Sequence, residues 1–183
     1  MVIALAPVLN LTGGQDFDPL KVTDLIASEF SSFNQVAVVP VNLALAELER
    51  RGKYAVETPQ DAVTLARALG ADAAVVVAIH EYNPYDPPVV GLTMQWYPAA
   101  GGALSDGAAG PRWQIQRVFN AAHEDVREEV QSYADERSEH GGPYGWQRYL
   151  QSQELYVRYC GWSAIRTMLR LDRAAARPHE AKS

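Results

Sequence analysis

The sequence has one cysteine, no apolar run long enough to cross a membrane, and no surplus of basic residues. Cys160 is alone among 183 residues, so no disulfide can form within the chain, and its apolar surroundings predict a small buried side chain. No stretch approaches the roughly 18 uninterrupted apolar residues of a membrane-spanning helix. The formal net charge of −6 disfavours a nucleic-acid partner, because phosphate backbones are bound by clustered Lys and Arg.

Motifs for catalysis, cofactors and metals are also missing. Thr12–Gly14 precedes a predicted helix, as a phosphate-binding turn would, but the GxGxxG and GxxxxGKS/T spacings are absent, and Asp16 and Asp18 would repel phosphate. His80 and Glu81 do not form an HExxH zinc motif, and strand alternation predicts that their side chains point to opposite faces. We therefore predict no catalytic residue, no cofactor and no metal.

The stretch from Leu69 to Tyr97 organises the rest of the chain. Ala73–Tyr82 and Gly91–Tyr97 are apolar runs with the length and residue types of strands, and Asn83–Pro88 between them is dense in turn residues. The pattern predicts a β-hairpin with a wide loop, preceded by a helix that ends at Leu69–Asp72.

Before the hairpin, the sequence predicts a βαβ unit followed by two helices. Val2–Val8 indicates a buried strand, a helix runs on to about Asn34, and Val36–Pro40 indicates a second strand parallel to the first. Asn42 is the expected cap of a helix over 43–51, and Thr58 with Pro59 opens a third helix that ends at Gly70.

After the hairpin, we expect a Gly/Ala/Ser-rich loop over 99–111, a strand over 113–119, and helices over 123–139 and 146–171. The strand alternates cleanly, with Trp113, Ile115, Arg117 and Phe119 on one face. The predicted fold is a single α/β domain over residues 1–172, in which 123–171 form a helical carboxy-terminal part and 173–183 a disordered tail. Its mixed sheet of about five strands, in the order βαβααβββαα, is covered by helices on both faces.

Four aromatic residues are the candidate protein-interface residues. For Tyr159 and Trp162 the ordinary interpretation is packing on the sheet, but both depart from the main apolar stripe of the last helix, which makes them candidates for an outward orientation toward a partner. Tyr82 and Tyr85 lie at the hairpin end, where exposed rings commonly bind other proteins.

Short segments of the first hundred residues resemble a known bacterial family. They are Ala4–Gly13 (ALAPVLNLTG), Leu25–Phe30 (LIASEF), Val36–Val39 (VAVV) and Ala68–Ala73 (ALGADA). The pattern is similar to that of the envelope α/β domains of the TolB amino-terminal domain, the curli-secretion lipoprotein CsgG and LpoB. In these, a P-N-T-G type turn follows the first strand and L-G-A-D precedes the third. Gly142–Leu150 (GPYGWQRYL) also resembles a segment of uncharacterised lipoproteins related to this group.

The resemblance implies a TolB-amino-terminal-like fold and a non-enzymatic envelope protein that binds envelope proteins or associates with itself. It implies a location in the periplasm or at the outer membrane, as a lipoprotein whose signal segment is missing from this chain. Long amphipathic hairpins and a lipid-bearing cysteine near the start are absent from the sequence, so pore formation and lipidation do not follow. The alternatives are a cytosolic α/β domain that binds a small ligand or nucleotide at Thr12–Gly14, and an enzyme that uses His80 and Glu81.

Overall fold

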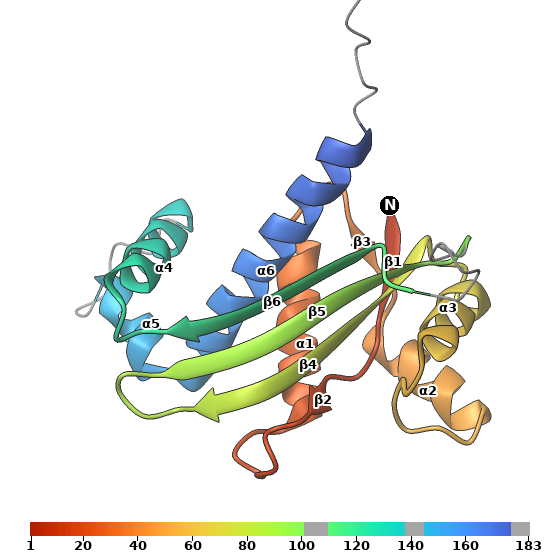
Figure 1. Ribbon diagram of the computed structural model, residues 1–183, viewed down its shortest axis with the longest axis horizontal. Coiled ribbons are helices and arrows are strands. Elements are labelled where there is room, and N and C mark those ends of the chain that lie inside the picture. The colour runs from red at the N-terminus through yellow and green to blue at the C-terminus, as the bar shows by residue number, and fades with distance from the viewer. Residues whose placement is uncertain (101–109, 138–144, 177–183) are drawn as a thin grey trace, which may run out of the picture.

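A computed structural model describes residues 1–100, 110–137 and 145–176. The sheet has six strands in the order β3-β1-β4-β5-β6, with β2 paired to β4 (Figure 1). The strands are β1 (Val2–Leu5), β2 (Leu9–Asn10), β3 (Ala37–Val38), β4 (Ala73–Asn83), β5 (Val89–Pro98) and β6 (Trp113–Asn120). The first strands are parallel, whereas β4, β5 and β6 form an antiparallel meander, which confirms the predicted mixed sheet.

The expected first strand is divided at Pro7, which raises the number of strands to six. Leu5 pairs with Val75 and Leu9 with Ala78, so this segment advances four residues while β4 advances three. Proline has no N–H for a ladder bond. The next N–H, of Val8, turns out of the sheet and donates to the Thr23 hydroxyl at 2.9 Å.

Three helices precede the hairpin, as the sequence predicts. They are α1 (Pro19–Ser31), α2 (Val41–Arg50) and α3 (Pro59–Ala68). Asp18 caps α1, and Thr58 with Asp61 forms a capping box at α3, so that the side chains satisfy free N–H groups of the first turn. The predicted Asn42 cap is wrong, because α2 begins at Val41 and follows Pro40 without a side-chain cap.

The carboxy-terminal part contains α4 (Glu124–Glu136), the short 3₁₀ helix η1 (Gly145–Gln147), α5 (Arg148–Gln151) and α6 (Gln153–Ala176). The prediction of one helix over 146–171 is wrong, because Ser152 is extended and separates α5 from α6. Residues 173–176, expected in the tail, continue α6. The rest of that tail and most of the expected loop over 99–111 lie outside the described residues.

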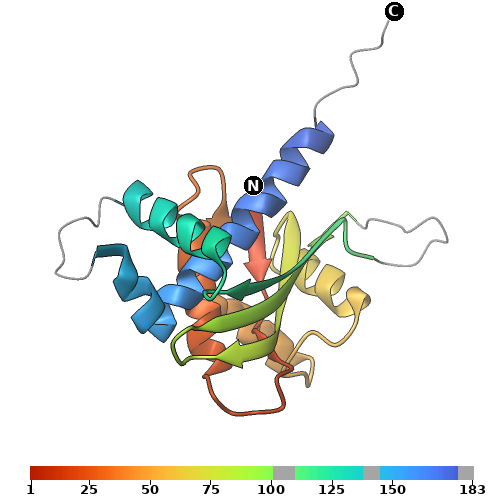
Figure 2. The ribbon, with the colours of Figure 1, turned by 60° about the vertical axis from the view of Figure 1, so that its left-hand side comes forward.

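The helices cover the sheet from both sides and define two cores. On one face, α1 and α6 pack on Val75, Val77 and Ile79 of β4 and on the matching side chains of β5 and β6. On the other face, α2 and α3 pack on Ala74 and Val76 and reach Tyr97 of β5. Figures 1 and 2 show α1 and α6 together behind the meander. They show α2 and α3 together at the end of the sheet where β4 begins. This arrangement confirms the prediction of helices on both faces.

A buried carboxylate joins three helices on the α6 side. Glu29 of α1 is fully buried and accepts a hydrogen bond from Arg158 of α6 at 2.6 Å and a second from Arg137, which follows α4. Burial of a lone carboxylate is costly, and two guanidinium groups compensate for it here. Gly161 lets α1 and α6 approach closely, since a β-carbon there would lie 3.3 Å from Ile26.

Candidate interaction surface

The outer half of one sheet face has no helix over it. α2 and α3 cover this face only near β1, the first half of β4 and Tyr97, whereas the far parts of β4, β5 and β6 pass in front of α1 and α6 in Figure 1. We call this surface the open face. It consists of His80, Glu81, Gly91, Thr93, Gln95, Gln114, Gln116 and Val118. Its one exposed large apolar side chain is that of Val118 on the edge strand β6, which is 47% exposed.

A β-bulge at His80 shapes this surface. Ile79 pairs with Leu92 and Glu81 with Gly91, so His80 is the extra residue. A β-carbon on Gly91 would lie 2.7 Å from Cε1 of His80 and 2.9 Å from Cβ of Glu81. Both side chains therefore lie on the face of Gly91, and the prediction that they point to opposite faces is wrong. The bulge interrupts the alternation on which that prediction rested.

The open face is polar but nearly uncharged. Nε2 of Gln95 donates to Oε1 of Gln114 at 2.9 Å across the strands, and the Tyr97 hydroxyl donates to Oε1 of Gln95 at 3.2 Å. Nε2 of His80 is buried with no hydrogen-bond partner. Within the described ranges no group of three or more His, Cys, Asp or Glu side chains is arranged to hold a metal ion. The face offers glutamine amides, the apolar side chain of Val118 and, beside the bulge, the exposed carboxylate of Glu81, a mixture that suits contact with another protein surface.

The hairpin end adjoins the open face and carries two of the candidate aromatic residues, of which Tyr82 points to the side of α1 and α6. Tyr85 in the turn is 77% exposed. Tyr82 is half-buried against Phe17, with ring centroids 4.9 Å apart, and its hydroxyl donates to Gln153 at 3.4 Å. Burial, and then the nearby Asp16 carboxylate, raise the pKa of Tyr82. The two rings thus differ, because only Tyr85 is free to meet a partner without rearrangement.

A pocket of about 250 Å³ lies beside Tyr82. It is lined by residues of the loop before α1, of α1 itself and of the start of α6: Asp16, Phe17, Asp18, Lys21, Val22, Leu25, Tyr82, Gln153, Glu154 and Val157. Its rim carries three carboxylates and one ammonium group. The pocket gives the hairpin end a shallow acidic recess next to its aromatic rings.

The other two candidate residues are buried, so their expected outward orientation is wrong. Tyr159 has no exposed surface and Trp162 is 7% exposed. The ring of Tyr133 on α4 meets that of Tyr159 at 5.8 Å and that of Trp162 at 5.0 Å between centroids. Because α4 packs against a second side of α6, the apolar surface of α6 is wider than the single stripe that the sequence predicts.

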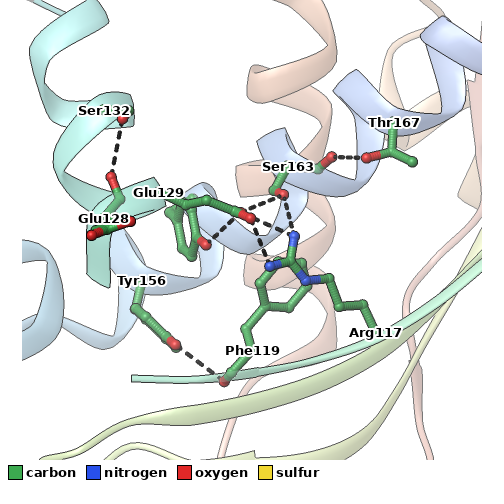
Figure 3. Close-up of polar contacts among 9 residues, drawn as sticks. Arg117, Phe119, Glu128, Glu129, Ser132, Tyr156, Ser163 and Thr167 are labelled. Carbon is green, nitrogen blue, oxygen red and sulfur yellow. Dashed lines mark hydrogen bonds and ion pairs between the residues drawn. The ribbon is translucent and has the colours of Figure 1, made fainter. Parts of the chain in front are cut away.

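Polar residues of β6, α4 and α6 gather around Glu129 of α4 (Figure 3). Arg117 of β6 makes a bidentate pair with Glu129 of α4, with N···O distances of 2.8 and 3.0 Å. Tyr159 and Ser163 also donate to Glu129, at 3.0 and 3.3 Å. Burial acts to raise the pKa of Glu129, but the hydrogen bonds from Arg117, Tyr159 and Ser163 outweigh it and leave that pKa lowered. Sequence alone missed Glu129 and Ser163, because nothing local pairs them with Arg117.

The turn at Thr12–Gly14 is closed on itself. The Asn10 carboxamide accepts from the N–H and the hydroxyl of Thr12 at 3.1 and 2.8 Å, and the Thr12 hydroxyl accepts from the Gly14 N–H at 3.1 Å. A phosphate would need these N–H groups as donors, but the turn already uses them for its own hydrogen bonds. The geometry therefore matches the plain strand-to-helix turn that the sequence predicts. No described helix is both long enough and apolar enough to cross a membrane.

The fold is a mixed α/β domain whose architecture is similar to that of a solved bacterial lipoprotein. It is similar to the lipoprotein GNA1162 from Neisseria meningitidis, with a TM-score of 0.51, 14% identity, and coverage of 76% of this chain and 97% of that one. The carboxy-terminal domain of LpoB from Salmonella enterica scores 0.49 at 16% identity, covering 65% of this chain and 82% of that one. The hypothetical protein CT253 from Chlamydia trachomatis scores 0.47 at 11% identity, covering 92% and 94%.

These likenesses concern the fold alone. No family model matches the sequence, and no curated protein matches it. The TolB and CsgG parts of the sequence resemblance are not among the structures reported above, so they stay predictions.

Proposed function

We propose that this protein is a non-enzymatic binding or assembly protein of the bacterial cell envelope, which acts through contacts with other proteins. The open face and the adjoining hairpin end form its working surface. The observation that carries the proposal is the absence of any described helix over the outer half of β4, β5 and β6, on a face that offers Val118, glutamine amides and the exposed ring of Tyr85.

The likeness to a lipoprotein domain supports the envelope part of this proposal through the fold. The chemistry of the surface supports the binding part. Tyr85 provides a large amphipathic ring, and such rings are enriched in protein interfaces. The amides of Gln114 and Gln116 can donate and accept hydrogen bonds without the desolvation cost of a charge. No observation on the described residues favours a nucleotide or a catalytic role.

Site-specific photo-crosslinking in living cells tests the proposal. A photoreactive phenylalanine analogue placed at Gln116 or Tyr85 is expected to form covalent adducts with another envelope protein, seen as discrete higher-mass bands. Tyr54 provides a matched control, because it is a tyrosine of similar exposure, at 86%, in the loop after α2 and away from the open face.

Adducts from the analogue at Gln116 and Tyr85, with none at Tyr54, support the open face as the working surface. Equal labelling at all three positions, or no adduct at Gln116 and Tyr85, overturns the assignment. Fractionation of the same cells reports whether the adducts are in the envelope, and adducts confined to the cytosol contradict the proposed location.

A further inference from the structure

The outer edge of β6 presents unpaired backbone groups. The ladder bond from the Ala121 N–H to the Pro88 carbonyl, at 3.0 Å, fixes which residues of β6 point toward β5. In an antiparallel pair these residues alternate along the strand. The residues whose N–H and C=O groups point away from β5 are therefore Gln114, Gln116, Val118 and Asn120. The Asn120 carbonyl accepts from the His123 N–H at 3.0 Å, whereas no hydrogen bond to the backbone groups of Gln114, Gln116 and Val118 is found in the described part of the chain.

Little in the strand itself blocks pairing with another chain. Over its eight residues β6 has no proline and keeps an unbroken register with β5. The usual devices that protect an edge are proline, a bulge or exposed charge. Arg117, the one charged residue of β6, points toward the core and is neutralised by Glu129.

A basic groove lies beside this edge. Its volume is about 220 Å³, and it is lined by Arg117, Glu129, Ser132, Trp162, Ser163, Arg166, Thr167 and Arg170. Three of these side chains are cationic and one is anionic. Arg117 is paired with Glu129, Arg166 makes a long contact of 3.4 Å with the exposed Glu136, and the exposed Arg170 has no partner in the described residues. The groove thus has excess positive charge in a chain whose net charge is −6.

We propose that the edge of β6 binds an extended, acidic segment of a partner protein as an additional β-strand. Backbone bonds to Gln114, Gln116 and Val118 would hold the segment, and its carboxylates on the core side would meet Arg166 and Arg170. This inference rests on the proposed function, for which it names the mode of contact and the partner's chemistry.

Charge also decides between such a segment and a second copy of this chain. Two copies paired through β6 about a two-fold axis would place their basic grooves on the same side of one continuous sheet. Arg166 and Arg170 of each copy would then lie near those of the other, and like charges at an interface cost affinity. An acidic segment instead complements them.

The test uses the full chain and a defined probe. A phage-displayed library of random 12-residue peptides is selected on the immobilised protein, and the consensus peptide is synthesised and its binding measured by calorimetry. We expect a consensus that alternates β-branched residues with Asp or Glu. We also expect added peptide to slow amide hydrogen exchange at Gln114, Gln116 and Val118 by tenfold or more.

Two pairs of variants identify the contacts. Gln116→Pro removes an outward N–H, and Gln116→Ala removes only the side chain; we expect at least a tenfold loss of affinity in the first and little change in the second. Arg170→Glu is expected to weaken binding tenfold or more. Its control is Arg173→Glu, because Arg173 lines a different pocket with Met1 and Gln35.

The exchange measurement on the unmodified chain decides the matter if Gln116→Pro fails to fold. Unchanged exchange at the three outward residues, a consensus without acidic residues, or equal affinity for Arg170→Glu and Arg173→Glu overturns the inference. If crosslinks still form at Gln116 and Tyr85 in cells, the proposed function stands without it. If those crosslinks are also missing, both fail.

Discussion

The imidazole of His80 occupies the space that a β-carbon on Gly91 would need, with Cε1 at 2.7 Å and Nδ1 at 2.9 Å from that position. Cβ of Glu81 is 2.9 Å away and cannot move without its backbone. Gly91→Ala is therefore expected to lower the free energy of unfolding by about 1–3 kcal/mol, the usual cost of overpacking. Chemical denaturation measures this loss.

Thr93→Ala is the matched control for this change, because Thr93 lies on the same face of β5 and is only partly buried. Its cost should be smaller than that of Gly91→Ala. Adding His80→Ala to Gly91→Ala should recover part of the loss. A Gly91→Ala protein as stable as the unmodified chain would contradict the close contact.

Glu29→Gln is expected to destabilise the protein by about 3–5 kcal/mol, as loss of one partner of a buried ion pair does. The change leaves the guanidinium groups of Arg137 and Arg158 without a counter-ion in a largely buried site. Glu154→Gln removes a carboxylate from an exposed pair with Lys21 and should cost less than about 1 kcal/mol. Denaturant midpoints measure both, and equal losses would show that Glu29 has no special role.

Stability should fall as the pH rises above about 10, the pKa of an unfolded tyrosine. Burial raises the pKa values of Tyr133, Tyr156 and Tyr159 far above that range, so the unfolded chain releases these protons while the folded chain retains them. Unfolding is then favoured increasingly at alkaline pH. Phenolate absorbance measures the ionisation, while circular dichroism follows the fold.

We expect these three of the nine tyrosines to ionise only as the protein unfolds. Tyr159→Phe removes one of them and should reduce the late absorbance change. Ionisation of all nine near pH 10 with the fold intact would contradict the burial of the rings.

The thiol of Cys160 should react only when the protein opens. It is fully buried on α6, and burial raises its pKa well above the ordinary value. Labelling with a thiol reagent near neutral pH is expected to be about 10³-fold or more slower than in denaturant, since domain stabilities make the open state that rare. A cysteine introduced at the exposed Ser31 in a Cys160→Ala background is the control and should react at once. Rapid labelling of native Cys160 would contradict its position in the core.

Sequence patterns predicted most of the elements because their signals are local. Pro19 and Thr58 mark the starts of α1 and α3, and the turn residues after Asn83 separate β4 from β5, as the structure confirms. The alternation from Trp113 to Phe119 also predicted correctly that Trp113, Ile115, Arg117 and Phe119 share one face of β6, and the structure turns that face toward the core.

The errors concern features that depend on a partner in space. The bulge at His80 is defined by its pairing with β5, and nothing in β4 itself marks it. Burial of Tyr159 and Trp162 requires α4 to lie over α6, a contact between segments joined by residues outside the described ranges. The sheet face beyond the Tyr82–Pro88 loop was an expected working surface, but the residues that form the open face could not be predicted, since they depend on where α2 and α3 end.

The bulge makes His80 the one residue of β4 that the pairing with β5 does not need. Ile79 and Glu81 already match Leu92 and Gly91, which are neighbours in β5. A chain that lacks His80 would therefore join its two halves of β4 into a regular strand and keep every later side chain on its present face. Loss of Glu81 would have the same effect, because His80 already lies on the face of Gly91. Loss of a residue elsewhere in β4 would turn the remainder of the strand over, so a deletion scan of β4 should find its tolerant positions at His80 and Glu81.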